Sequence, residues 1–410
     1  MRRIRNGIPR SLASILEAVV AHPHRGAKPC PALLRHGKAN RERVAHRCPT
    51  AREMRPDGKA EPRPREKGAA PVRVLVVAPA WVGDMVMAHA IVPGLAERGH
   101  EVHFLAPPST AALASRMPGV AEVHTVCTRH GELGWRARRR AARTLSERRF
   151  GRAVVLPNSY KSALTPLWAG IPVRTGFRGE FRYGVVNDLR RLDEARMPRL
   201  VDRYAALADV VPANPRLQAD TVALRSLTRQ GLRTDRPVVA LCPGAEYGPA
   251  KRWPAERYAA LAARCVEAGA SVWILGTDAE RQAAEQILAA ATAVDLTGKT
   301  SLLDAVDLLS AAAVAVVNDS GLMHVAAALA VPVVALFGSS SQTFTPPLSA
   351  RARVLERDLD CRPCFARTCP LGHLDCLVGI GVDQVFDTVA DLGGFKTRNT
   401  HETHATAGCP

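Results

Sequence analysis

The stretch VLVVAPAWVGDMV, residues 74–86, has the pattern of a buried strand, a tight glycine turn and the first turn of a helix. A dinucleotide-binding fold would bind its pyrophosphate at such a helix N-terminus. This stretch lacks the G-x-G-x-x-G pattern, and its turn contains Asp84, whose carboxylate would repel phosphate. The stretch therefore predicts an α/β fold and argues against a NAD-dependent dehydrogenase. It leaves two roles open for Asp84, capping of the helix or participation in chemistry.

Short apolar strands alternate with helical patterns from residue 72 to residue 338, in two successive runs. Near-continuous apolar strands separated by helices are typical of parallel sheets with helices on both faces. We therefore expect two Rossmann-like, doubly wound domains facing a cleft at the carboxyl ends of their strands. The first run of expected strands comprises residues 72–78, 101–106, 122–126, 153–157 and 173–177, and the second comprises residues 237–244, 270–276, 293–298, 312–319 and 331–338.

Four segments are expected along the 410 residues. Residues 1–70 contain 17 Lys and Arg against six Asp and Glu, with few large apolar residues, which predicts a disordered basic extension. Because this extension accounts for most of the net charge of +18, and lacks interleaved aromatic residues, we do not expect nucleic-acid binding. Residues 71–232 would form the first domain, residues 233–395 the second, and residues 396–410 a frayed tail.

The sequence also indicates in which cellular compartment the protein is expected. No stretch approaches the ~18 consecutive apolar residues of a membrane span. The apolar run near the N-terminus is short, contains Glu17 and has no evident small-residue cleavage site, which argues against a signal peptide. We therefore expect a cytoplasmic protein.

Two stretches of the first half contain basic residues where strands are expected to end. Ser159 would cap a helix whose first turn holds Lys161, an unfavourable place for a cation unless it has a function. Further on, Arg174, Arg178 and Arg182 recur every fourth residue in a glycine-rich stretch that predicts a loop. A loop with three guanidinium groups could bind carboxylate or phosphate, because the guanidinium fork matches both.

In the second half, CPGAEYGPAKRWP, residues 242–254, predicts a loop before a helix that starts at Trp253-Pro254. The loop contains Gly244, Lys251 and Arg252. The Lys-Arg pair is either solvated surface charge or a flexible cationic group suited to a diphosphate.

The stretch VVNDSGLMHVAAALAVPVVALFG, residues 316–338, predicts a strand, a helix opened by Ser320 and Gly321, and a second strand. With no carboxylate inside the first turn, this helix N-terminus offers free N–H groups to a phosphate. His324, one turn later on an otherwise apolar helix, is either a buried core residue or a ligand contact.

Four stretches together resemble one family, the ADP-heptose:lipopolysaccharide heptosyltransferases of glycosyltransferase family 9, and the likeness is greatest to its heptosyltransferase II branch. They are VLVVAPAWVGDMVM, VLPNSYKSALTPLWAGIPVRTGFRGEFRYG, CPGAEYGPAKRWP and NDSGLMHVAAAL, in the order and spacing of the family. The resemblance extends over about residues 72–390 and implies a GT-B fold, with the acceptor bound by the first domain and the nucleotide-sugar by the second.

The resemblance also implies a reaction and its residues. An inverting, metal-independent transfer of L-glycero-D-manno-heptose from ADP-heptose to the first heptose of the lipid A–Kdo inner core would use Asp84 as general base and Lys251 at the departing ADP. The donor would further contact Gly244, Asp319, Ser320, Gly321 and His324, with Asp278 as a weaker match for a ribose-hydroxyl acceptor. The acceptor's anionic groups would contact Lys161, Arg174, Arg178 and Arg182.

The family implies a lipid-borne acceptor, so we expect the protein to be peripheral to the inner face of the cytoplasmic membrane, and we expect a monomer. Two alternatives stay open: a GT-B enzyme with another donor or acceptor, such as a nucleotide-sugar 2-epimerase, and a non-catalytic nucleotide-sugar-binding relative. The family's pattern has no 70-residue extension, and Pro93-Gly94 would kink or end the helix that Asp84 begins.

A cysteine cluster stands apart from these motifs. Cys361, Cys364, Cys369 and Cys376 give the spacing C-x₂-C-x₄-C-x₆-C, with His373 inside it. Four cysteines within 16 residues of a cytoplasmic protein favour a structural zinc site or a redox-sensitive site over disulfides. No cofactor is expected to be required for catalysis.

Overall fold

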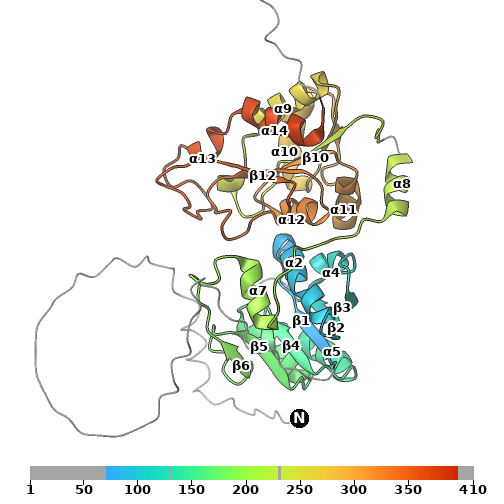
Figure 1. Cartoon of the computed structure of the whole chain (residues 1–410), viewed down its shortest axis with the longest axis vertical. Coiled ribbons are helices and arrows are strands. Elements are labelled where there is room, and N and C mark those ends of the chain that lie inside the picture. Colours follow the sequence, from blue (N-terminus) through green and yellow to red (C-terminus); the bar gives the residue numbers. More distant parts are fainter. Residues whose placement is uncertain (1–70, 129–131, 230–231, 396–410) are drawn as a thin grey trace, which may run out of the picture. The chain divides into compact units, whose positions relative to one another are not determined.

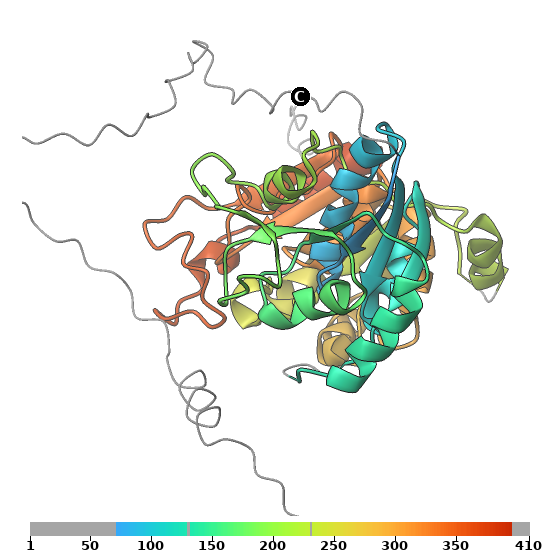
Figure 2. The ribbon, with the colours of Figure 1, turned by 90° about the horizontal axis from the view of Figure 1, so that it is seen from below.

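The computed structural model describes residues 71–128, 132–229 and 232–395. The expected basic extension, residues 1–70, and the expected frayed tail, residues 396–410, lie outside the described residues. The described chain contains two six-stranded sheets in which every pairing is parallel, with helices on both faces of each sheet (Figures 1 and 2). The two expected Rossmann-like sheets are therefore confirmed.

The first sheet has the strand order β3-β2-β1-β4-β5-β6, which is the order of a dinucleotide-binding domain. Its strands are β1 (Arg73–Val77), β2 (Glu101–Ala106), β3 (Val120–Thr125), β4 (Arg152–Val155), β5 (Val173–Phe177) and β6 (Asp188–Arg190). The helices between and after them are α2 (Val82–Ala88), η1 (His89–Ile91), α3 (Val92–Ala96), α4 (Pro108–Ala114), α5 (Trp135–Ser146), η2 (Tyr160–Ala163), α6 (Leu164–Trp168), α7 (Leu200–Ala208) and α8 (Thr221–Arg229).

The second sheet repeats this topology, with the order β12-β11-β10-β7-β8-β9. Its strands are β7 (Val238–Cys242), β8 (Ser271–Ile274), β9 (Val294–Asp295), β10 (Val314–Asn318), β11 (Val333–Phe337) and β12 (Ala352–Glu356). Its helices are η3 (Pro249–Lys251), α9 (Ala255–Glu267), η4 (Asp278–Glu280), α10 (Arg281–Ala290), α11 (Leu302–Ser310), α12 (Gly321–Ala328), α13 (Asp375–Val378) and α14 (Val382–Gly393).

The central strands are apolar at every position because both of their faces are covered. In β1, Val74 and Val76 pack with α2 and α7 on one face, whereas Leu75 and Val77 pack with α5 on the other. β7, β10 and β11 are buried over their whole length in the same way. Exposing such strands on either face would remove much of the burial that stabilises the fold.

The strand order determines where ligands can bind. Each sheet changes its winding direction at its centre, between β1 and β4 in the first and between β7 and β10 in the second, and ligands of this fold bind at the carboxyl ends of these strands. Asp84 follows β1, Gly244 follows β7, and Asp319 follows β10. The topology thus brings the three predicted motifs to the switch points.

Contacts between described residues join the two halves of the chain. Arg116, after α4, donates to the buried carboxylate of Asp307 in α11 at 3.0 Å. The same carboxylate accepts from the backbone N–H of Asp220 at 2.7 Å, and Leu217 N donates to Ala328 O at 3.1 Å. The expected boundary near residue 232 falls between β6 and β7 and stays a proposal.

The structure differs from the sequence-based expectation at the sheet edges. β6 and β12 are additional to the expected strands, and β9 is only two residues long within the expected strand 293–298. As expected, the helix that contains Asp84 is interrupted before Pro93, where the 3₁₀ turn η1 separates α2 from α3. No helix of the described segments is long and apolar enough to cross a membrane.

Candidate functional site

Asp84 lies in the first turn of α2, and it does not cap this helix. The N-cap residue is Trp81, and no side chain makes a capping hydrogen bond there, so the capping interpretation is wrong. Burial raises the pKa of Asp84 to about 6, against an opposing effect of the Lys251 cation and with a smaller contribution from Asp319. The buried hydroxyl of Tyr204 in α7 is near enough for the Asp84 charge to help raise its pKa. Asp84 is therefore a carboxylate with an unusually high proton affinity.

The N-terminus of α2 lies against the N-terminus of α12. A Cβ added to Gly83 would lie 2.7 Å from Cδ2 of His324, and one added to Gly321 would lie 2.8 Å from Cβ of Val82. Only glycine permits this approach at either position. The contact brings Asp84 of the first half to the motif Asn318-Asp319-Ser320 of the second half.

Lys251 and Asp319 form an ion pair opposite Asp84. The Lys251 Nζ lies 2.5 Å from Oδ2 of Asp319, and the hydroxyl of Ser340 donates to the same oxygen. The side chains of Lys251 and Asp319 are 16% and 5% exposed, so water screens the pair only weakly. Lys251 also lies 4.8 Å from the ring centroid of Tyr247, a cation–π contact. A preorganised cation is thus held beside the N-terminus of α12.

Asn318 fixes the loops around this pair, a role that the sequence did not indicate. Its buried side chain donates to Pro243 O at 2.7 Å and accepts from Trp253 N at 3.1 Å and from the Tyr258 hydroxyl at 3.2 Å. The amide therefore connects the start of the loop of residues 242–254 to the start of α9. Since Lys251 lies between those two points in the chain, Asn318 helps to position it.

Ser320 is the N-cap residue of α12, without a side-chain capping bond, so the expected helix N-terminus is present at Gly321. His324 is buried one turn later, and burial lowers the pKa of its imidazole to about 4, with Lys251 adding to the effect and Asp319 opposing it. The ring is therefore neutral near pH 7. It can donate or accept a hydrogen bond but contributes no positive charge.

Near Gly244 the buried acidic residue is Glu280 rather than Asp278. Asp278 is exposed and pairs with Arg281 at 2.5 Å. Glu280 is 8% exposed and lies so close to Gly244 that a Cβ there would be 2.8 Å from Cδ of Glu280. One of its oxygens, Oε2, accepts from the N–H of Thr277 at 2.9 Å and from the hydroxyl of Thr277 at 2.7 Å. The sequence pattern did not indicate which of these two carboxylates is buried beside Gly244.

The basic residues expected to contact an acceptor divide into two pairs. Arg182 is 1% exposed and donates to Phe177 O, Pro157 O and the side chain of Asn158 at 2.6–3.0 Å. Arg174 lies in β5 and donates to the backbone oxygens of Ile171 before the strand and of Gly184 and Val185 after it.

These two guanidinium groups hold the loop together, and the placement does not support direct contact with an acceptor. Arg178 is exposed and Lys161 is partly exposed, so both remain available for such contact. Ser159 does not cap η2 with its side chain; its backbone oxygen accepts from the Ser162 hydroxyl.

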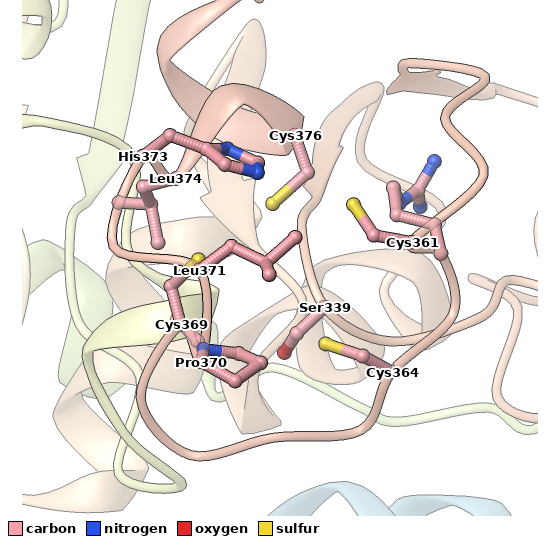
Figure 3. A pocket seen from close by; sticks show the side chains of 11 residues that line it. Ser339, Cys361, Cys364, Cys369, Pro370, Leu371, His373, Leu374 and Cys376 are labelled. Carbon is pink, nitrogen blue, oxygen red and sulfur yellow. The ribbon is translucent and has the colours of Figure 1, made fainter.

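The four clustered cysteines line one pocket together with His373 (Figure 3). All four are free thiols, and within the described residues no three of their sulfur atoms come within 4.8 Å of one another. Their sulfur atoms do not converge on one point, so these residues do not fit a structural zinc ion, one of the two expectations for the cluster. Hydrogen bonds from the backbone N–H groups of residues 371–374 lower the pKa of Cys369.

The cysteine segment supports the loop that contains Lys251. The hydroxyl of Tyr247 donates to Phe365 O at 2.6 Å, and Phe365 N donates to Ser339 O at 2.8 Å. The guanidinium of Arg362 donates to Gly338 O and Ser340 O. The segment thus contacts the residues next to the Lys251–Asp319 pair, which indicates a supporting role.

Taken together, one carboxylate with a raised pKa lies close to a cation and a helix N-terminus. Such a carboxylate can accept a proton from a hydroxyl near neutral pH. The cation and the helix N-terminus can stabilise a phosphate group on which negative charge develops. The arrangement suits transfer of a group from a phosphate ester to an alcohol.

Comparison with known proteins gives consistent matches. The sequence model of glycosyltransferase family 9 (heptosyltransferase) matches residues 138–375. The chain is 44% identical over 305 residues to lipopolysaccharide heptosyltransferase 2 of Escherichia coli (strain K12), covering 69% of this chain and 88% of that protein. It is 38% identical over 309 residues to lipooligosaccharide heptosyltransferase 2 of Haemophilus influenzae, with the same coverage. Among solved structures, that of ADP-heptose LPS heptosyltransferase II from E. coli matches with a TM-score of 0.70 and 40% identity, covering 78% of this chain and 98% of that chain.

Proposed function

Because this chain belongs to glycosyltransferase family 9, the heptosyltransferases, we propose that it transfers L-glycero-D-manno-heptose from ADP-heptose to the first heptose of the lipid A–Kdo inner core. The names of its relatives, lipopolysaccharide heptosyltransferase 2 and ADP-heptose LPS heptosyltransferase II, support this donor and this branch of the family. The observation that supports the reaction most strongly is the placement of Asp84, with its raised pKa, close to the Lys251–Asp319 pair.

In the proposed reaction Asp84 is the general base. The acceptor hydroxyl gives its proton to the Asp84 carboxylate while its oxygen bonds to the anomeric carbon of the heptose. The bond from that carbon to the diphosphate oxygen breaks on the opposite face, and ADP leaves with the electron pair, so the configuration inverts. A base of this kind typically contributes about 10²–10⁴-fold. A pKa of about 6 makes Asp84 a stronger base than an ordinary Asp and leaves it mostly ionised at pH 7.

The departing ADP would be stabilised by the second half of the chain. Lys251 would turn from Asp319 toward the diphosphate, and the N–H groups at Ser320 and Gly321 would donate to its oxygens. His324, neutral because of its burial, would donate a hydrogen bond in the same region. Since the chain itself supplies this positive charge, we propose that transfer needs no catalytic metal and no cofactor.

The nucleoside part of the donor would lie at the carboxyl ends of β7 and β8. Gly244 allows close approach of the backbone, and a carboxylate after the second strand of such a unit typically binds ribose hydroxyls. We keep Asp278 as a candidate, and the burial of Glu280 against Gly244 favours Glu280 for this role.

The acceptor is lipid-borne, and we propose peripheral contact with the membrane. Helix α5 has four exposed arginines on one face, Arg136, Arg139, Arg140 and Arg143, and no acidic residue. The side chain of Phe181, in the loop after β5, is 90% exposed. A basic helix face and an exposed aromatic ring are typical of contact with anionic lipid headgroups. Lys161 and Arg178 would meet the anionic groups of the acceptor itself.

The test is transfer of heptose to Kdo-lipid A that already holds one heptose, followed by mass spectrometry. We expect addition of a single heptose from ADP-heptose, with far less product from ADP-glucose or UDP-GlcNAc. Preference for a uridine nucleotide would indicate another GT-B activity. Tight binding of ADP-heptose without product would indicate a non-catalytic relative.

A further inference from the structure

The first sheet contains the tripeptide Glu-Val-His twice, on two neighbouring strands. Glu101-Val102-His103 lies in β2, and Glu122-Val123-His124 lies in β3. The parallel register pairs His103 with Glu122 and Leu105 with His124. Because side chains alternate between the two faces of a strand, the two carboxylates and the two imidazoles share one face of the sheet.

These four side chains contact one another in a defined order. Nε2 of His103 lies 2.8 Å from Oε1 of Glu101, and Nδ1 of His103 lies 3.2 Å from Nε2 of His124. Oε2 of Glu122 lies 3.8 Å from the same Nδ1 of His103. One ligand atom each from His103, Glu122 and His124 lies within 4.8 Å of the other two, the only such group of three within the described residues.

We propose that His103, His124 and Glu122 bind a zinc ion that cross-links β2 to β3. Two imidazoles, one carboxylate and a water are an established tetrahedral ligand set for zinc. Tetrahedral geometry with Zn–N bonds of ~2.05 Å places two ligand nitrogens about 3.3 Å apart, close to the observed 3.2 Å. On binding, the metal would take the place of the proton between Nδ1 of His103 and Nε2 of His124.

Glu101 orients the first ligand. A carboxylate that accepts from one ring nitrogen of a histidine leaves the other nitrogen free as a ligand, and zinc-binding histidines typically have such a partner. Here Nε2 of His103 lies against Glu101, and Nδ1 lies toward His124 and Glu122. In the neutral ring, Glu101 thus favours the tautomer with its lone pair on Nδ1, which metal binding requires.

The surroundings of the cluster favour binding in some respects and weaken it in others. The Phe150 ring is perpendicular to both imidazoles, at centroid distances of 5.1 Å from His103 and 6.1 Å from His124, and covers one side of the site with an apolar group. The Glu122 side chain is 39% exposed, which leaves a path for the ion. Arg148 binds Oε1 of Glu122 at 3.0 Å but leaves Oε2 facing His103, and Arg73 binds Glu101 at 3.0 Å. Because these two cations oppose a divalent ion, we expect moderate affinity.

The site is independent of the proposed transfer reaction. The reacting groups lie beyond the carboxyl end of β1, whereas His103 is the third residue of β2 and faces Phe150. β3 is an edge strand, paired only with β2 in its sheet. Zinc at this position would stabilise the edge of the sheet and would not take part in chemistry.

The test uses the untagged full chain, with Zn²⁺ titrated by calorimetry and Co²⁺ followed by absorption spectroscopy. Co²⁺ bound to nitrogen and oxygen gives visible d–d bands without the thiolate charge-transfer band that cysteine ligands would add. The variants are His124→Asn, Glu122→Gln and Glu101→Gln, with the exposed Glu97→Gln as matched control. A double variant, Cys361→Ser with Cys364→Ser, reports any binding at the cysteine cluster.

We expect one Zn²⁺ equivalent that raises the melting temperature and is lost in His124→Asn. The Zn²⁺ affinity should fall in Glu122→Gln and should fall about 10–100-fold in Glu101→Gln. It should be unchanged in Glu97→Gln and in the cysteine variant. Zn²⁺ stoichiometry that is the same in wild type, His124→Asn and Glu122→Gln would overturn the proposal. A thiolate charge-transfer band that disappears with the cysteines, with no other d–d signal, would overturn it as well. Since Glu122 is partly exposed, its variant tests the site even if His124→Asn folds poorly.

Discussion

Replacing Asp84 by asparagine should make the protein more stable and nearly inactive at the same time. The pKa of Asp84 is raised from 3.8 to about 6, mainly by burial, so the folded state holds the ionised carboxylate at a cost. The protonated Asp84 carboxyl gives its full stabilising contribution to the folded state below pH 3.8. This contribution is lost as the pH rises through 6 and the group ionises. A shift of about two units corresponds to about 3 kcal/mol of unfolding free energy. The neutral amide of the variant has no charge to desolvate and avoids this cost.

The difference between variant and wild type should therefore depend on pH. We expect the Asp84→Asn protein to be more stable by about 3 kcal/mol at pH 8 and by only about 1 kcal/mol at pH 4.5. Urea unfolding followed by circular dichroism at several pH values measures this difference, with Glu97→Gln as an exposed carboxylate control. In parallel, heptose transfer should fall about 10²–10⁴-fold. A stability gain that is the same at every pH would show that the Asp84 charge is not what destabilises the fold, and near-normal turnover would show that Asp84 is not the base.

Three further substitutions test the residues around Lys251 and the contact between α2 and α12. Lys251→Met should lower kcat roughly 10²–10³-fold, as loss of a preorganised charge does, with a smaller change in donor KM measured in the same transfer assay. Asn318→Ala should destabilise the protein by about 1–3 kcal/mol, because it leaves buried groups of two loops without partners, and denaturant titration measures this. Gly83→Ala should lower both melting temperature and turnover, since its Cβ would lie 2.7 Å from the His324 ring; unchanged values for both would contradict the close approach of α2 and α12. For wild type, kcat/KM should fall as the pH drops below about 6, where Asp84 becomes protonated.

Much of the fold could be predicted from the sequence because its central strands are apolar on both faces. β1, β7, β10 and β11 lie within two residues of their expected limits at each end. β6 and β12 could not be predicted in this way. β6 is the three-residue segment Asp188–Arg190, and every residue of β12 keeps some exposure at the sheet edge, so neither has the apolar signal of a buried strand.

The site was predictable where motifs follow strands and unpredictable where it depends on side-chain packing. Asp84, Lys251 and Asp319 were expected near one another, and the structure brings them together. The Arg174 and Arg182 side chains turn toward backbone oxygens of this segment. Residue spacing in the sequence does not show which oxygens these are.

Other features depend on strand register and on burial. The alignment of the two Glu-Val-His tripeptides follows from the register of β2 and β3, which includes an irregularity between Val102 and His103. Sequence spacing alone does not show such a register. Likewise, Asp278 and Glu280 are two residues apart, and only burial distinguishes them.

In the proposed reaction the two halves of the chain have different roles: the first half supplies a base, and the second half binds the diphosphate. A crystal structure of the complex with ADP would show whether they do. We expect phosphate oxygens within hydrogen-bonding distance of Lys251 Nζ and of the backbone N–H groups at the start of α12, with Asp84 facing the side from which an acceptor would attack. A diphosphate bound at the N-terminus of α2, with Lys251 still paired to Asp319, would contradict it.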